Sequence, residues 1–73
     1  MSESDAFTYE GIDREGVAGV GCFNGTAADI GPFVHRRFGA GWQSLIVSAG
    51  DVQVGGIAIL EGDRLWWAED GHV

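Results

Sequence analysis

The sequence contains no lysine, so four arginines carry every fixed positive side-chain charge against eleven aspartates and glutamates, and the formal net charge is −7. A surface that binds nucleic acid needs clustered cations to neutralise phosphates. The only cationic cluster is His35-Arg36-Arg37, so we expect no direct nucleic-acid binding. The missing lysine, beside abundant glycine, alanine, valine and aspartate, is typical of GC-rich coding such as that of actinobacteria and their phages.

The sequence has one cysteine, Cys22, which excludes a disulfide within the chain. Metal sites usually combine cysteine and histidine at short spacings such as CxxC or HxxxH, and neither occurs here. A nucleophilic cysteine needs a base within hydrogen-bond reach and a group that orients this base. Nothing in the sequence indicates such a role for His35 or His72. We therefore predict no catalytic residue, no metal and no cofactor, and we expect Cys22 to be a small buried apolar residue.

Long apolar segments are also missing: the longest run, residues 54–60, includes two glycines and is too short to span a bilayer. The opening MSESDAF lacks the basic and apolar regions of a signal peptide. We therefore expect a cytoplasmic protein without membrane contact, in the host cytoplasm if a phage encodes it. A chain of 73 residues makes one domain at most. We expect a mobile N-terminus over residues 1–5 and a single small β-rich domain over residues 6–73.

The sequence is rich in glycine, with thirteen residues that mostly stand singly among apolar ones. Glycines in this pattern indicate turns and β-bulges. Phe7 and Tyr9 alternate with polar neighbours, which indicates a first strand. A second strand is predicted over residues 17–23, with its odd-numbered and even-numbered side chains on opposite faces. Asn24-Gly25 predicts a turn after this strand.

The next segment has the features of a short helix. Thr26 and Asp29 have the spacing of a capping box, with Asp in place of the usual Glu. Proline is tolerated at the start of a helix but not deep inside it. Gly31-Pro32 therefore predicts a short turn over residues 27–30 and a helix over residues 32–38, closed by Gly39.

The remaining chain is predicted to form a three-stranded antiparallel meander, with strands over residues 42–48, 52–60 and 65–69. In the middle strand, Val52 and Val54 differ in parity from Ile57 and Ile59. A β-bulge at Gly55-Gly56 adds one residue and returns all four apolar side chains to the same face. We therefore predict a bulge there.

Together these elements predict an α+β fold. It consists of a small, mostly antiparallel β-sheet of four to five strands, which includes the C-terminal meander, and one short helix against a face or an end of the sheet. A small open β-barrel is the alternative.

The most informative side chains are three tryptophans: Trp42, Trp66 and Trp67. Within a strand, Trp66 and Trp67 point to opposite faces. We expect Trp67, which shares its face with Leu65, to anchor the core. Trp66 then lies on the other face, where it either packs under the helix or the N-terminal segment or forms an interface.

The adjacent tryptophans favour a non-enzymatic interaction module, because the sequence shows no set of residues arranged for catalysis. We expect it to self-associate, for example as a homodimer, or to dock on a protein partner through a tryptophan face or a free sheet edge. The predicted partner-binding residues are Trp42, Trp66, Arg36 and Arg37. Guanidinium groups bind carboxylates in bidentate fashion, although the arginines equally fit a solvated helix end.

The acidic residues support an alternative function. An acidic inhibitor that mimics nucleic acid would occupy a basic groove on a host enzyme or regulator. Such a mimic needs its carboxylates gathered on one face. The other interpretation is that carboxylates spread through turns and termini keep a small domain soluble.

Overall fold

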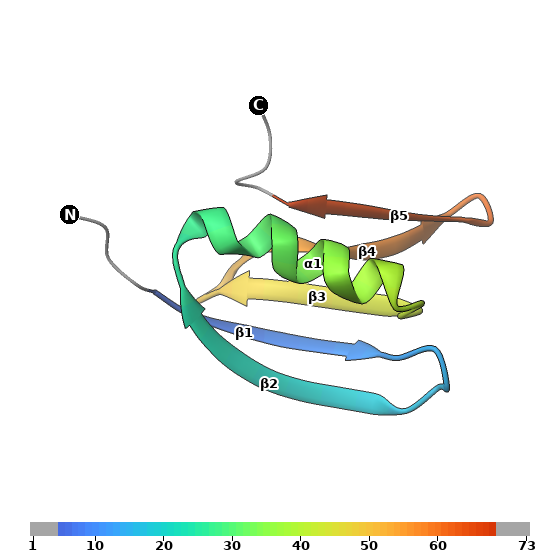
Figure 1. Cartoon of the computed structure of the whole chain (residues 1–73), viewed down its shortest axis with the longest axis horizontal. Coiled ribbons are helices and arrows are strands. Elements are labelled where there is room, and N and C mark those ends of the chain that lie inside the picture. The colour runs from blue at the N-terminus through green and yellow to red at the C-terminus, as the bar shows by residue number, and fades with distance from the viewer. Residues whose placement is uncertain (1–4, 69–73) are drawn as a thin grey trace.

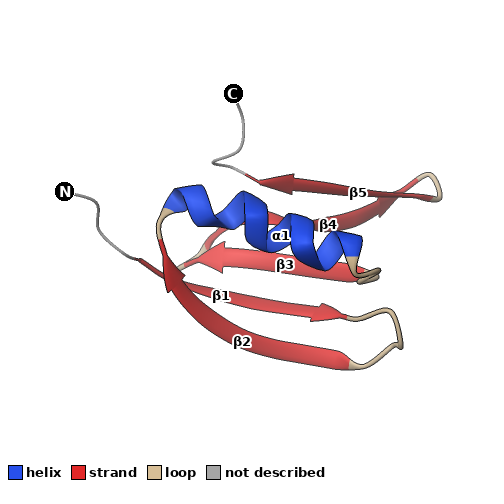
Figure 2. Ribbon diagram, in the orientation of Figure 1, coloured by secondary structure: helices blue, strands red, loops and turns tan. Residues whose placement is uncertain are grey.

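A computed structural model describes residues 5–68, which form a five-stranded antiparallel sheet with a helix packed on one face (Figure 1; Figure 2). The predicted α+β class is confirmed, and the sheet is open, so the barrel alternative is wrong. The elements in chain order are β1 (Asp5–Ile12), β2 (Ala18–Gly25), the 3₁₀ turn η1 (Ala27–Asp29), α1 (Ile30–Gly39), β3 (Ser44–Ala49), β4 (Val52–Leu60) and β5 (Asp63–Ala68).

The strand order is β2-β1-β3-β4-β5, so β2 and β5 are the two edges of the sheet. The first strand, β1, lies inside the sheet and pairs antiparallel with both β2 and β3. Consequently β2 and β3 run in the same direction, and η1 with α1 connects them across one face (Figure 1). Within the described part of the chain, no helix is long and apolar enough to cross a membrane.

The core lies between α1 and this face of the sheet. Alternate residues of the inner strands point to the helix, as the period of two requires. The helix contributes Ile30 and Val34 to the core. The buried apolar residues are Phe7, Ile30, Val34, Leu45, Val47, Val54 and Ile57. The described residues place no second layer on the opposite face, which therefore stays open to solvent (Figure 2).

The predicted bulge in β4 is present, one residue earlier than expected. The register shifts so that Gly55 pairs with Val47 while Gln53 pairs with Ser48, which leaves Val54 as the extra residue. Val54 thereby joins the core. Bulges of this kind bend a strand and increase its twist.

Each glycine of the Gly55-Gly56 pair serves a different face of the sheet. A Cβ atom on Gly55 would lie 2.8 Å from Ile30 Cγ2, so glycine lets α1 approach β4 closely. A Cβ atom on Gly56 would lie 3.4 Å from Nε1 of Trp67, whose indole therefore lies beside this bare stretch of backbone on the other face.

The helix begins at Ile30, two residues earlier than predicted, and includes Gly39, which was expected to close it; Ala40 is the C-cap, and Gly41 adopts the positive φ of 90°. Pro32 fits because it lies in the first turn, where backbone N–H groups have no partner within the helix. The predicted capping pair is present: the backbone N–H of Thr26 donates to Asp29 Oδ2 at 2.8 Å.

The turn predicted at Asn24-Gly25 is wrong. Both residues continue β2 and pair with Ala6 and Asp5 of β1, because the pairing with β1 outweighs the local turn preference. The predicted mobile N-terminus falls outside the described residues except for Asp5, the first residue of β1. Glu69, predicted as the end of the last strand, also lies outside them.

Candidate functional site

The face of the sheet opposite α1 is the candidate site, and we call it the uncovered face. It receives alternate side chains from all five strands, because residues that pair across an antiparallel ladder share a face. Its central residues are Thr8, Glu10 and Ile12 from β1, Val20 and Cys22 from β2, Ile46 and Ser48 from β3, Gln53 and Ala58 from β4, and Leu65 and Trp67 from β5.

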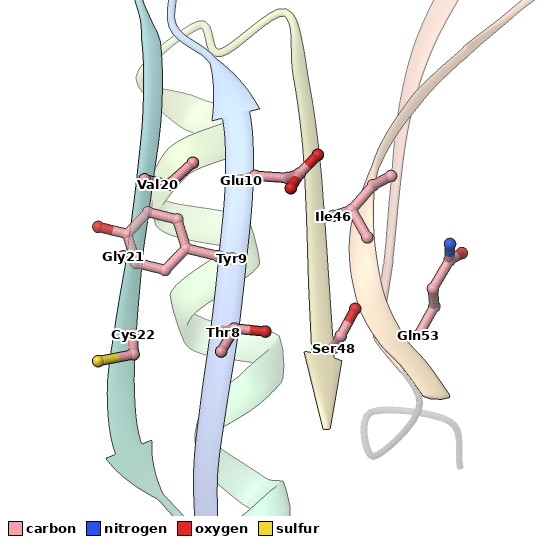
Figure 3. A pocket seen from close by; sticks show the side chains of 9 residues that line it. All are labelled: Thr8, Tyr9, Glu10, Val20, Gly21, Cys22, Ile46, Ser48 and Gln53. Carbon is pink, nitrogen blue, oxygen red and sulfur yellow. The ribbon is translucent and has the colours of Figure 1, made fainter. Parts of the chain in front are cut away.

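Two shallow hollows lie next to each other on this face, with volumes of about 600 and 530 Å³. Glu10, Val20, Ile46 and Gln53 line both, so the hollows form one continuous groove. The lining of the first hollow also includes Thr8, Cys22 and Ser48, which add two hydroxyls and a thiol to a largely apolar surface (Figure 3). The second has an apolar lining completed by Ile12, Ala58 and Trp67. The groove therefore offers a mostly apolar surface along its length, with the hydroxyls of Thr8 and Ser48 at one end and Trp67 at the other.

Large apolar side chains on this face are accessible to solvent. Their exposed fractions range from 37% for Trp67 to 78% for Val20, with Ile12, Ile46 and Leu65 between them. Soluble proteins rarely leave contiguous apolar patches open unless something binds there. The uncovered face is thus the most obvious contact surface among the described residues.

Glu10 is the only carboxylate in the groove lining. Its neighbours across the ladders are Val20 on one side and Ile46 on the other. Figure 3 shows the Glu10 side chain extending toward β3 and Ile46. A carboxylate surrounded by apolar neighbours attracts a cation and disfavours another carboxylate.

The prediction for Trp67 is wrong, whereas Trp66 packs against the helix, as one of the two alternatives given for it expects. Trp66 lies on the helix side, where its ring stacks on His35 at 5.1 Å between centroids and also meets Phe38. Trp67 does not anchor the core but lies on the uncovered face with Leu65. The reason is that β5 is an edge strand, so neither of its faces is fully covered.

The predicted partner-binding residues lie on the helix side of the sheet. Arg37 and Trp42 belong to an aromatic cluster that covers β1 and β2 beside α1. The Arg37 guanidinium lies 4.4 Å from the Phe33 ring centre, 4.8 Å from Trp42 and 5.0 Å from Tyr9. Its Nε is buried without a hydrogen-bond partner, and Phe33 stacks on Phe23 at 4.3 Å.

This aromatic cluster gives Arg37 and Trp42 a role within the chain. The neighbouring Arg36 is exposed and has no such stacking contact among the described residues. The structure therefore separates two arginines that are adjacent in the sequence: one is packed against aromatic rings and the other is open to solvent.

Cys22 is exposed, so the prediction that it is buried is wrong. It lies on the uncovered face of the edge strand β2, where no other element covers it (Figure 3). His35 is on α1 and stacks on the opposite edge of the sheet, so the fold does not bring this thiol and imidazole together. The described residues contain no group of three side chains arranged to hold a metal, and His72 lies outside them.

The described carboxylates divide between the two ends of the sheet. Those of the β1–β2 and β4–β5 turns lie at one end, and Asp5, Asp29 and Asp51 lie at the other (Figure 1). Glu10 is the exception on the uncovered face. Among residues 5–68, the carboxylates are therefore not gathered on one face. No known protein family matches the sequence, and no curated protein or solved structure is detectably similar to it.

Sequence reasoning did not find Glu10, Val20 or Ile46 as site residues. The sequence shows that these residues alternate with apolar or glycine residues, and this alternation correctly assigns the side chains of β1 and β2 to the two faces of the sheet. However, nothing local to these residues indicates whether a second layer covers their face.

Proposed function

We propose that the protein is a non-enzymatic interaction module that binds a protein partner through the uncovered face. The observation that carries this proposal is the set of solvent-accessible apolar side chains on that face, with Trp67 at one side of the groove and Val20 at the other. Aromatic and large aliphatic anchors provide most of the binding free energy at protein interfaces.

The partner is expected to present an apolar surface with a basic side chain opposite Glu10. Burial of Glu10 beneath a purely apolar partner would leave its charge without a counterpart, which is strongly unfavourable. A lysine or arginine at that position compensates the charge. The net charge of −7 also favours the approach of a basic partner.

This proposal replaces Trp66 by Trp67 as the main aromatic contact, because Trp67 is the tryptophan on the uncovered face. Arg36 and Trp66 lie on the helix side, so a partner seated in the groove does not reach them without wrapping around β5. Arg37 and Trp42 stabilise the fold in this proposal.

The test uses paired variants. A partner captured from a lysate of the source cells is purified, and its dissociation constant is measured with Ile46→Lys and with Val52→Lys. Both variants add one charge at an exposed apolar site, but Ile46 is in the groove and Val52 is outside it. We expect Ile46→Lys to weaken binding by at least tenfold and Val52→Lys to have little effect. Equal effects of the two variants would refute the assignment of the face.

A further inference from the structure

The free edge of β2 is unusual because it has none of the features that normally keep strands from pairing with other chains. Natural edge strands carry lysine, other charges, proline or bulges, or they are very short. β2 is eight residues long, contains no charged residue and no proline, and pairs with β1 without a register shift. The other edge, β5, begins with Asp63 and Arg64.

The ladder between β1 and β2 determines which backbone groups of β2 face outward. The N–H of Asp13 donates to the carbonyl of Val17 at 3.1 Å, and the carbonyl of Ile12 accepts from Gln43 on the β3 side. Asp13 and Val17 thus form a hydrogen-bonded pair, and hydrogen-bonded and non-hydrogen-bonded pairs alternate along an antiparallel ladder. Every second residue counted from Val17, that is, each odd-numbered residue of β2, therefore bonds to β1. The outward N–H and C=O groups therefore belong to Ala18, Val20, Cys22 and Asn24.

We infer that β2 pairs antiparallel with β2 of a second copy of this chain, with Gly21 at the two-fold axis. This register pairs Val20 with Cys22 of the other copy and Ala18 with Asn24. All four outward residues of each copy then have partners. Moving the axis to Val20 or to Cys22 leaves Asn24 or Ala18 outside the ladder, so the Gly21 register forms the most hydrogen bonds.

Side chains favour the same register. On the helix side it places Phe23 of one copy opposite Gly19 of the other. A Cβ atom on Gly19 would have only Trp42 Cη2 within 4 Å, at 3.8 Å, so there is space for a bulky neighbour at this position. On the uncovered face the apolar Val20 and Cys22 side chains become neighbours across the new ladder.

The self-complementary register, which places Phe23 of each copy opposite Gly19 of the other, selects a second copy as the occupant, and the charge distribution permits it. Two chains with a net charge of −7 repel each other, and contact is least unfavourable where neither surface carries a carboxylate. β2 itself carries no carboxylate, whereas a face-to-face dimer would bring the two Glu10 side chains into an apolar contact. Edge pairing also merges the two uncovered faces side by side and leaves both open. It therefore does not depend on what the uncovered face binds.

The experiment measures the mass in solution across a wide concentration range for the wild type, Val20→Pro, Val20→Thr and Ile46→Lys. Val20→Pro removes an outward N–H that has no partner among residues 5–68, at a site that is 78% exposed. We expect a wild-type dimer, and a dissociation midpoint raised roughly thirtyfold or more in Val20→Pro because the dimer loses two donors. Val20→Thr keeps the N–H, and Ile46→Lys alters only the face, so both should still dimerise.

Amide hydrogen exchange tests the register. Ala18, Val20, Cys22 and Asn24 should gain protection with rising concentration, while the inward odd-numbered residues of β2 are protected throughout. A wild-type monomer at all concentrations, or a dimer that Ile46→Lys dissociates and Val20→Pro does not, would overturn edge pairing. Neither result bears on the partner proposed for the uncovered face, because that proposal is tested separately by the dissociation constants of the Ile46→Lys and Val52→Lys variants. A dimer in which Ala18 or Asn24 stays unprotected would overturn the Gly21 register.

Discussion

Replacement of Arg37 by methionine should destabilise the fold by about 2 kcal/mol. Methionine keeps an unbranched stem that packs on the aromatic cluster but removes the guanidinium. The guanidinium lies within 5.0 Å of three ring centres, those of Phe33, Trp42 and Tyr9. A cation–π contact contributes ~0.5–1 kcal/mol at partly exposed sites, and three such contacts sum to about 2 kcal/mol.

The assay is urea unfolding followed by tryptophan fluorescence. Urea is chosen because guanidinium chloride would itself screen charges and compete for the rings. A domain of this size has an m-value of about 1 kcal/mol/M, so the midpoint for Arg37→Met should fall by about 2 M. Arg36→Met is the matched control, since Arg36 is the exposed neighbour on the same helix, and its effect should stay within ~0.5 kcal/mol.

Equal midpoints for Arg37→Met and Arg36→Met would refute the reasoning, because the charge above the rings would then contribute nothing. A double-mutant cycle with Trp42→Leu isolates one contact. A coupling free energy of ~0.5–1 kcal/mol between Arg37 and Trp42 is expected, and a coupling near zero would show that this ring does not contribute.

Three further predictions concern packing, capping and the free thiol. Gly55→Ala should destabilise by ~1–3 kcal/mol in thermal unfolding, since its Cβ lies 2.8 Å from Ile30 Cγ2. Gly39→Ala, which meets nothing within 4 Å, should be neutral or stabilising; the opposite order would refute the close-approach explanation. Asp29→Ala should cost ~1 kcal/mol and lower the Tm by roughly 4–8 °C, and an unchanged Tm would show that the cap is dispensable. Cys22 in the dilute native protein should react stoichiometrically with a thiol reagent, and protection until denaturant is added would contradict its exposure.

Local patterns predicted most of the secondary structure because the signals that determine it are local. Alternation of apolar residues located the strands, and the bounds of β4 agree with the prediction. The parity change between Val54 and Ile57 revealed the bulge, although Val54 rather than a glycine is the extra residue. The spacing of Thr26 and Asp29 identified the start of the helical segment.

The strand order could not be predicted, because it depends on contacts between residues far apart in the sequence. Tyr9 pairs with Val47, and neither local sequence contains a signal for the other. Any arrangement of the hairpin beside the meander would satisfy the same alternation. The uncovered face is a consequence of this order and of the single helix, so its residues could not be recognised as a site.

The faces of Trp66 and Trp67 were assigned incorrectly for a related reason. Leu65 and Trp67 make the more apolar face, which usually points to the core. In β5, however, Arg64 lies on the helix side and donates from its Nη2 to the carbonyl of Phe38 at 3.1 Å. Its guanidinium also lies 4.7 Å from the Phe38 ring centre. At an edge strand, a long polar side chain can occupy the core-facing side because its charged end still reaches water.

The position of β1 inside the sheet has a consequence for how the protein is made. During translation, β1 and β2 leave the ribosome as an isolated hairpin, which is marginally stable at best in water. The chain from the end of β2 to the end of β3 takes roughly one to five seconds to synthesise at ~5–20 residues per second. Throughout that time, β1 has an unpaired second edge and Phe7 lacks its neighbours from β3 and β4. The described fold therefore forms only after β4 has been synthesised, and a fragment that ends before β4 lacks the core residues Val54 and Ile57.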